Sequence, residues 1–359
     1  MKHSVDPLYY QRTRYAQALV SMLADGIVSA FTLFAPRRMG KTQFLLNDIK
    51  PAAEQAGFDV FYFSFMDAGL HTEIRFQQAL LEFAQNLTAS SKIKNWLTSI
   101  QSVEVLGASI TRSAVHEHIS VSEVIEELAQ GKKPVLMLLD EVQELARIEG
   151  TANLVRSLRT GLDIHRAKVK VIFTGSSTNG LRQMFNDNKA PFFQFAHAMD
   201  FPVLDREFTD FLADIYEKRT GKMLDKDAMY QWFVRLEHIP LHMRTIIQNM
   251  ILNPDLSLDE AGNHQKQHLY DDPAYSDKWL TLKAMDQRIL HSIAHGKQGL
   301  YSEDSRRALA ESLGVDEVTV SQMQAALRRL ERDDLITKNS ANQWAINHPD
   351  MEGWIKENS

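Results

Sequence analysis

The sequence contains no cysteine among its 359 residues, which excludes disulfide bonds, thiol nucleophiles and cysteine metal sites. It also has no run of about 18 apolar residues, the length that a membrane-spanning helix requires. Positive charge is not in excess, because 40 basic residues stand against 46 acidic ones. A basic surface over the whole protein is therefore excluded, and any contact with DNA must come from a local patch.

Signals for other kinds of site are also missing. The start of the chain, MKHSVDPLYYQ, lacks the apolar core of a secretory signal, so we expect a cytoplasmic protein without a membrane segment. There is no G-x-S-x-G nucleophile motif. Three histidine pairs are spaced four residues apart but lack the H-E-x-x-H pattern, so we expect them to be solvated or core residues: His238/His242, His264/His268 and His291/His295.

What the first half of the chain does contain is four short apolar runs rich in Val, Ile or Phe, at 27–35, 58–65, 134–140 and 169–175. Strands buried on both faces of a parallel sheet have this pattern. Between the runs lie segments of helical periodicity, at 41–57, 73–87 and 122–131. This alternation predicts an α/β fold with a doubly wound parallel sheet.

The pattern changes after Pro202, where helical segments follow one another without a strand: 208–220, 226–236 and 241–252. From about residue 281, two helical segments, a glycine turn, a long helix and two strand-like pieces follow in the order of a winged helix-turn-helix. We therefore predict three domains, a core over 1–205, an all-helical lid over 206–280 and a winged helix over 281–359. We expect residues 272–278 to be a linker.

A phosphate-binding loop is indicated by APRRMGKT, which matches G-x-x-x-x-G-K-[ST] with Ala35 in the first glycine position. In this pattern, backbone N–H groups surround phosphate oxygens at a helix N-terminus. Lys41 would lie between the β- and γ-phosphates, and the Thr42 hydroxyl would ligate Mg²⁺. Alanine is the smallest departure from glycine, so we expect it to be tolerated. We assign the whole loop to nucleotide binding: Ala35, Pro36, Arg37, Arg38, Met39, Gly40, Lys41, Thr42 and Gln43.

Two further strands end in polar residues. The run PVLMLLDE ends in Asp140, which would hold Mg²⁺ through water, and Glu141, which would polarise the attacking water as a general base. Adjacent carboxylates at the end of a buried strand are costly unless a cation lies near them. After Thr174, the hydroxyls of Ser176 and Ser177 could position that water, although ordinary turn chemistry explains them equally well. We prefer Ser176.

Together, APRRMGKT, LLDEVQEL and FTGSS resemble the nucleotide motifs of the ASCE division of P-loop ATPases. Within that division, the chain resembles the archaeal-type ATPases of the STAND/AAA-like group along its whole length. The resemblance implies ATP and Mg²⁺ as ligands and a strand order of 5-1-4-3-2. The absence of a guanine-reading NKxD motif agrees with ATP. The resemblance also implies that the segment 9–19 packs near the adenine, with Arg12 as its arginine and Tyr10 close by.

The chain departs from the group at two places. The group's lid has a Gly-x-Pro motif, which is HIP here, with His238 in place of the glycine. Pro240 would still contact the adenine. Arg244 is either a sensor of the γ-phosphate or a surface arginine at a helix start. The group's arginine after a PF motif is missing from 191–199. An arginine finger would have to come from elsewhere. The candidates are Arg156, Arg159, Arg37 and Arg38, although for any single one of them a solvated surface position is the favoured interpretation.

The predicted recognition helix has an inward stripe of Val320, Met323, Ala326, Leu327 and Leu330, and polar faces with Thr319, Gln322, Gln324, Arg328 and Arg329. Gln and Arg can read base edges. However, residues 283–359 hold 10 basic and 12 acidic residues, which is unfavourable for phosphate contacts. Two functions remain. One is a slow ATPase that couples nucleotide state to duplex DNA through residues 281–359. The other is a signalling or scaffold ATPase that uses self-association or a protein partner.

Overall fold

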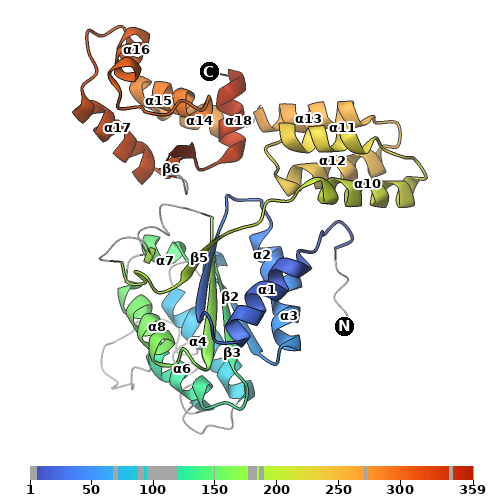
Figure 1. Cartoon of the computed structure of the whole chain (residues 1–359), viewed down its shortest axis with the longest axis vertical. Coiled ribbons are helices and arrows are strands. Elements are labelled where there is room, and N and C mark those ends of the chain that lie inside the picture. Colours follow the sequence, from blue (N-terminus) through green and yellow to red (C-terminus); the bar gives the residue numbers. More distant parts are fainter. Residues whose placement is uncertain are drawn as a thin grey trace, which may run out of the picture.

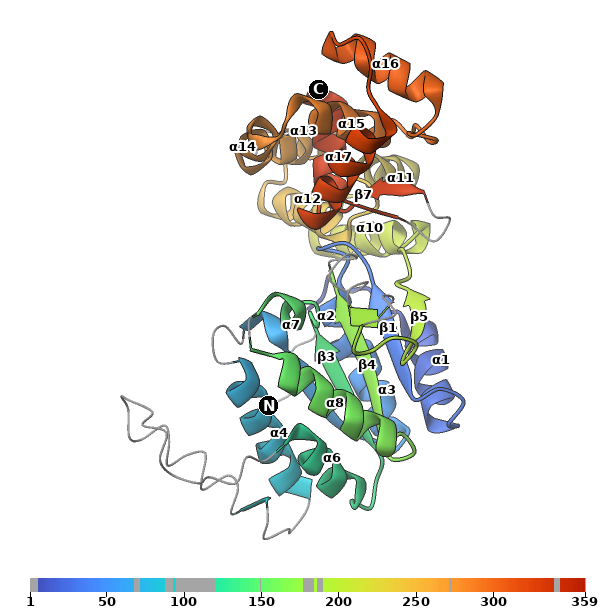
Figure 2. The same ribbon diagram turned by 90° about the vertical axis from the view of Figure 1, so that its left-hand side faces the viewer.

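The computed structural model describes residues 6–67, 72–87, 93–94, 120–148, 150–176, 184–185, 190–270, 273–338 and 343–358. A parallel five-stranded sheet forms the centre of the N-terminal part (Figures 1 and 2). Its order is β2-β3-β4-β1-β5, which is the predicted order 5-1-4-3-2 read from the other edge. The predicted doubly wound sheet is therefore confirmed. The strands are β1 (Ala30–Phe34), β2 (Asp59–Ser64), β3 (Val135–Asp140), β4 (Val169–Gly175) and β5 (His197–Asp200).

Helices cover both faces of this sheet, as Figure 2 shows. One face carries α1 (Thr13–Ala24), α2 (Lys41–Phe44), the π-helix η1 (Leu45–Ile49) and α3 (Lys50–Gln55). The other carries α4 (Thr72–Leu87), α6 (Val121–Ala129) and α8 (Ala152–Ile164), with the short η2 (Phe65–Asp67) and α7 (Glu144–Arg147) near the strand ends. Each face has its own apolar core, and β3 and β4, buried along their whole length, separate the two. This is the layering that continuous apolar strands require.

The lid is a bundle of α10 (Arg206–Thr220), α11 (Lys226–Arg235), α12 (Pro240–Leu252) and α13 (Leu258–Tyr270). Its core is aromatic and aliphatic and includes Phe208, Trp232 and Phe233. Leu8 joins this core, and the Tyr10 ring packs edge-on against Phe208 and Phe211. The segment before α1 therefore ties the lid to the nucleotide-binding half of the molecule.

The C-terminal part contains α14 (Pro273–Thr281), α15 (Ala284–Ala294), α16 (Glu303–Leu313), α17 (Val320–Arg332), the hairpin β6 (Ile336–Lys338) with β7 (Trp344–Ile346), and α18 (Pro349–Asn358). The predicted winged helix is confirmed. The predicted linker at 272–278 is wrong, because residues 273–281 are helical and Tyr275 and Trp279 pack against the winged-helix core. The domain boundaries themselves stay a prediction.

The recognition helix α17 buries Met323, Ala326, Leu327 and Leu330, as predicted. Val320, by contrast, is exposed, because it is the first residue of the helix and lies beyond the core. Thr319 and Gln322 form a reciprocal capping box, with Oγ1 of Thr319 accepting from the Gln322 N–H at 3.2 Å. Their side chains therefore stabilise the helix start.

Candidate nucleotide site

The phosphate loop follows β1 directly and leads into α2. Gly40 has φ 89°, a left-handed conformation that favours glycine, and it lies at the N-cap position of α2. Lys41 is buried, and its Nζ donates to the carbonyl oxygens of Ala35 at 2.8 Å and Pro36 at 2.9 Å. Burial lowers the pKa of Lys41, against the opposing charges of Glu141 and Asp140. The loop is thus an anion-binding arrangement around one desolvated ammonium group.

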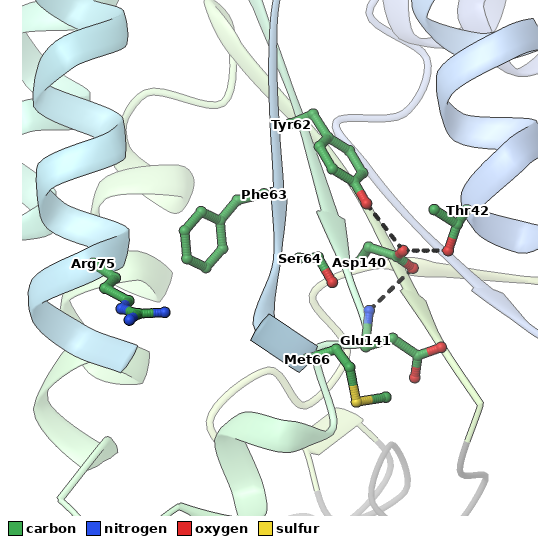
Figure 3. A pocket seen from close by; sticks show the side chains of 8 residues that line it. All are labelled: Thr42, Tyr62, Phe63, Ser64, Met66, Arg75, Asp140 and Glu141. Carbon is green, nitrogen blue, oxygen red and sulfur yellow. Dashed lines mark hydrogen bonds between the residues drawn. The ribbon is translucent and has the colours of Figure 1, made fainter. Parts of the chain in front are cut away.

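Asp140 is the centre of a polar cluster at the carboxyl end of β3. Its Oδ2 accepts hydrogen bonds from Thr42 Oγ1 at 2.6 Å and Tyr62 OH at 3.3 Å (Figure 3). Its Oδ1 accepts one from Thr174 Oγ1. Asp140 is only 1% exposed. Three strand ends and the start of α2 therefore converge on a single carboxylate.

This cluster fits a magnesium ion in its chemistry. A hydroxyl oxygen and a carboxylate oxygen lie 2.6 Å apart, and Mg²⁺ prefers such hard oxygen donors. Mg²⁺ usually keeps several waters and takes its other ligands from phosphates, so one or two protein oxygens suffice. Within the described ranges, no group of three or more His, Cys, Asp or Glu residues is placed to hold a metal by itself.

Glu141 and Ser176 are brought together, as their strand-end positions predict. Ser176 Oγ donates to Glu141 Oε2 at 2.8 Å. Gln143, which the sequence did not single out, donates from Nε2 to the same Glu141 oxygen and also to Ser176 Oγ at 3.2 Å. Glu141 lines, together with Thr42, Tyr62 and Asp140, a cavity of about 550 Å³ (Figure 3). Ser177 lies outside the described residues.

A second cavity, of about 200 Å³ and mostly apolar, lies between the loop and the lid. It is lined from the core by Tyr10, Arg12, Met39, Gly40 and Gln43, among others, and from the lid by Phe208, Pro240, Leu241 and Arg244. The predicted adenine-side residues are thus together at one cavity beside the loop. His238 has φ 53°, a left-handed conformation that glycine adopts more readily than a residue with a side chain.

Arg12 joins the loop to a buried cluster that the sequence did not reveal. Its guanidinium donates to the Met39 carbonyl at 3.1 Å and lies 4.8 Å from the centre of the Phe201 ring. Its backbone N–H donates to Asp48 at 3.1 Å, and Tyr9 OH donates to the same carboxylate. Burial is the main cause that lowers the pKa of Arg12 and raises those of Tyr9 and Asp48. The π-helix η1 presents Asp48 at this point, and π-turns of this kind are frequent at functional sites.

Other predicted residues lie apart from these clusters. Arg156 is exposed on α8 and bonds to the carbonyl of Ala152, four residues earlier. Arg159 lies over the Phe195 ring at 4.2 Å and close to Asp163. Arg37 and Arg38 line a further cavity, between the loop and the winged helix, and Arg38 also lines the cavity between the loop and the lid. Which of these, if any, acts as a finger stays a prediction.

One contact joins the loop to the end of the chain. Arg38 donates to Asp350 Oδ2 at 2.5 Å, and Asp350 Oδ1 lies 2.7 Å from Nε2 of the buried His242. Gln265 Nε2 lies 3.2 Å from Nδ1 of the same ring. Burial raises the pKa of Asp350, but the hydrogen bond from His242 and the charges of His242 and Arg38 outweigh it, so the net pKa is lowered. No sequence pattern marks this pair of partners, because they are separated by 312 positions.

A parallel sheet of this order, a phosphate loop after β1 and an acidic strand end after β3 define a P-loop ATPase of the AAA-like kind. The chain belongs to the family of ATPase domains found predominantly in Archaea, whose profile matches residues 9–234, more than half of its length. It is therefore an ATP-binding and ATP-hydrolysing protein. No curated protein matches the sequence.

Solved structures share the fold over nearly the whole chain. The Walker-type ATPase PABY2304 of Pyrococcus abyssi has 17% identity and a TM-score of 0.63, covering 98% of this chain and 100% of that one. The ORC2 protein of Aeropyrum pernix in its ADP form has 14% identity and a TM-score of 0.57, covering 99% and 97%. Across the described elements, no helix is both long enough and apolar enough to cross a membrane.

Proposed function

We propose that this chain is a Mg·ATP-dependent switch, in which the nucleotide state sets the position of the winged helix. Lys41 would transfer its hydrogen bonds from the loop carbonyls to β- and γ-phosphate oxygens. Thr42 and Asp140 would hold Mg²⁺, which supplies charge neutralisation on the phosphates when bound. Glu141 would accept a proton from the attacking water, with Ser176 orienting that water.

The base would occupy the cavity between the loop and the lid. Its walls combine apolar side chains, including Leu8 and Pro240, with the guanidinium of Arg244. A flat, apolar ring fits such a slot, and the cavity opens next to Gly40 of the loop. Arg244, which pairs with Asp6, would exchange that partner for phosphate and so report the nucleotide to α12.

The observation that carries the coupling is the Arg38–Asp350 ion pair. Arg38 belongs to the phosphate loop, and Asp350 belongs to α18 of the winged helix. An incoming triphosphate would compete with Asp350 for the same guanidinium, since both are anions that arginine binds well. Further cross-domain pairs, Lys356 with Glu237 at 3.3 Å and Lys266 with Glu357 at 2.6 Å, lie at the lid side of α18. Nucleotide binding would thus weaken one edge of this interface and leave the other as a hinge.

The second part of the proposal concerns what the winged helix binds. The charges favour a protein partner or another copy of this chain over DNA. Arg329, one of the two arginines of the polar stripe, is bound by the buried Asp286 through two hydrogen bonds, at 2.5 and 2.7 Å. Of the residues on the predicted polar faces, Thr319, Gln322, Gln324 and Arg328 are exposed, and Thr319 and Gln322 bond to each other in the capping box. With 10 basic against 12 acidic residues, the segment 283–359 has no excess of phosphate-binding charge.

The coupling is tested by measuring a distance between the core and the winged helix. Because the chain has no cysteine, two can be introduced without removing any, for example Gln55→Cys at the end of α3 and Ser321→Cys on α17, both exposed. Spin labels there should give a different distance distribution with ATP in the Glu141→Gln background than with no nucleotide. The same labels in a Lys41→Met protein should not respond. Identical distributions in every nucleotide state would contradict the switch.

The partner is tested separately, by steady-state hydrolysis with and without duplex DNA. A protein-directed switch predicts the same rate in both. A rate that rises with DNA and falls back at high salt would assign the winged helix to DNA instead.

A further inference from the structure

Gln143 lies in the turn that follows β3 and is completely buried. Its neighbours explain this position. Val142 and Leu145 pack in the apolar core beside α4, α6 and α8, and the Val142 N–H donates to the Thr174 carbonyl at 3.0 Å. With both flanking apolar residues anchored, the turn must direct the polar side chain of Gln143 inward, underneath the acidic strand end.

The amide of Gln143 joins the two polar strand ends. Nε2 donates both to Glu141 Oε2 and to Ser176 Oγ, while Ser176 Oγ itself donates to the same Glu141 oxygen. The orientation of the amide is fixed by chemistry, because an ionised carboxylate only accepts hydrogen bonds and so must face the NH₂ group. One carboxylate oxygen, Oε2, is therefore held by two donors, whereas none of the described residues donates a hydrogen bond to Oε1.

This arrangement is unfavourable in two ways. Glu141 has φ 54°, which is strained for a residue with a side chain. Oε1 of Gln143 is buried and has no hydrogen-bond donor in the described part of the chain. A leucine or methionine would fill the same space without leaving a polar atom unpaired. Such costs in a buried turn indicate a functional requirement for the amide.

We propose that Gln143 is a positioning residue for hydrolysis, which orients Glu141 and Ser176 towards one water molecule. By holding Oε2, it would direct Oε1 of Glu141 at the water. That oxygen would take a proton as the water oxygen bonds to the γ-phosphorus and the bond to the β,γ-bridging oxygen breaks, giving ADP and phosphate. The inference rests on the proposed roles of Glu141 and Ser176.

The test uses Gln143→Met, which keeps the volume and removes the donor, and Gln143→Glu, which places a second carboxylate beside Glu141. We expect kcat to fall between about 10- and 100-fold in the methionine variant, the range for a displaced catalytic group, and further in the glutamate variant. The KM for ATP and the Kd of ATP should stay within twofold, because Gln143 does not contact the phosphate loop. The matched control, Gln55→Met on the surface, should behave as wild type.

A double-mutant comparison separates positioning from packing. In a Glu141→Gln background, Gln143→Met should cause no further loss of kcat, because the group that it orients is gone. A wild-type kcat in Gln143→Met, or an equal loss in both backgrounds, would overturn the inference and leave the ATPase mechanism standing. A wild-type protein no faster than Glu141→Gln would overturn the role of Glu141 and this inference with it.

Discussion

Asp350, in the last helix of the chain, forms an ion pair at 2.5 Å with Arg38 of the phosphate loop. The same carboxylate contacts the buried His242 of the lid, so a single side chain of the winged helix contacts both the core and the lid. The Asp350 side chain is 9% exposed, which makes the pair less screened than a surface ion pair.

Removing this carboxylate should loosen the winged helix. Asp350→Asn leaves Arg38 without its ion pair, and we expect a loss of about 1–2 kcal/mol in the unfolding free energy. This is more than for a surface pair but less than for a buried one, because the Arg38 side chain is 43% exposed. The matched control is Glu357→Gln, which removes a more exposed pair with Lys266 across the same interface and should cost less than about 1 kcal/mol. Thermal or urea unfolding measures both. Equal effects of the two variants would show that Asp350 is an ordinary surface partner.

The same carboxylate predicts a pH dependence. Its folded pKa lies below its ordinary value of 3.8, so the ionised form stabilises the fold fully above that value and progressively less as the pH falls through the lowered one. The stability difference between wild type and Asp350→Asn should therefore be constant near neutral pH and shrink below about pH 4. Melting temperatures of both proteins between pH 3 and pH 7 measure this, and a difference that grows with acidity would be inconsistent with the ion pair.

Lys41→Met should separate stability from binding. ATP affinity should fall about 10- to 100-fold, since one charge-assisted hydrogen bond to phosphate contributes about 1.5–3 kcal/mol.

The same variant also tests stability. Burial lowers the pKa of Lys41, so the charged side chain reduces the free energy of unfolding at pH values below its folded pKa. This cost disappears as the pH rises towards the ordinary pKa of lysine. Without nucleotide, the variant should therefore melt no lower than wild type at pH 7. The exposed Lys132→Met is the control for both calorimetric titration and melting. A variant that binds ATP normally would refute the loop assignment.

A packing prediction concerns the lid. A Cβ on Gly262 would lie 2.5 Å from the Trp232 ring, whose Nε1 donates to Asp259 at 2.9 Å. Gly262→Ala should therefore destabilise the protein by about 1–3 kcal/mol through overpacking, although alanine is the better helix former. Asn263→Ala, at the exposed next position of the same helix, should be neutral or slightly stabilising. Chemical denaturation of the two variants distinguishes them, and a stabilised Gly262→Ala would contradict this packing.

The sheet could be predicted, and the candidate phosphate loop could be located, because both leave local signals in the sequence. Buried parallel strands are continuous apolar runs, and Asp140 and Ser176 follow such runs directly. β5 could not be located in this way, since only four residues, mostly exposed, form it at the sheet edge. Helix α14 was mistaken for a linker because it is short and has no fully buried residue, so Tyr275 and Trp279 alone give too weak a helical pattern.

The contacts that join the domains could not be predicted. Arg38 of the phosphate loop contacts Asp350 of α18 across 312 positions of sequence, and neither residue stands in a periodic pattern that marks an interface. Gln143 was overlooked for a different reason, because a glutamine in a turn is ordinary and its burial depends on Val142 and Leu145 packing on either side. Chemistry that depends on residues close together in the sequence can be predicted from it, whereas contacts between residues far apart in the sequence cannot.

The assignment of the site is tested by the hydrolysis of Mg·ATP by wild-type and Glu141→Gln proteins, with the Kd of ATP measured for both. We predict equal binding and a rate reduced about 10²- to 10⁴-fold in the variant, as expected for loss of a general base. Equal rates in the two proteins would contradict this assignment, because hydrolysis would then not pass through the site formed by Lys41, Asp140 and Glu141.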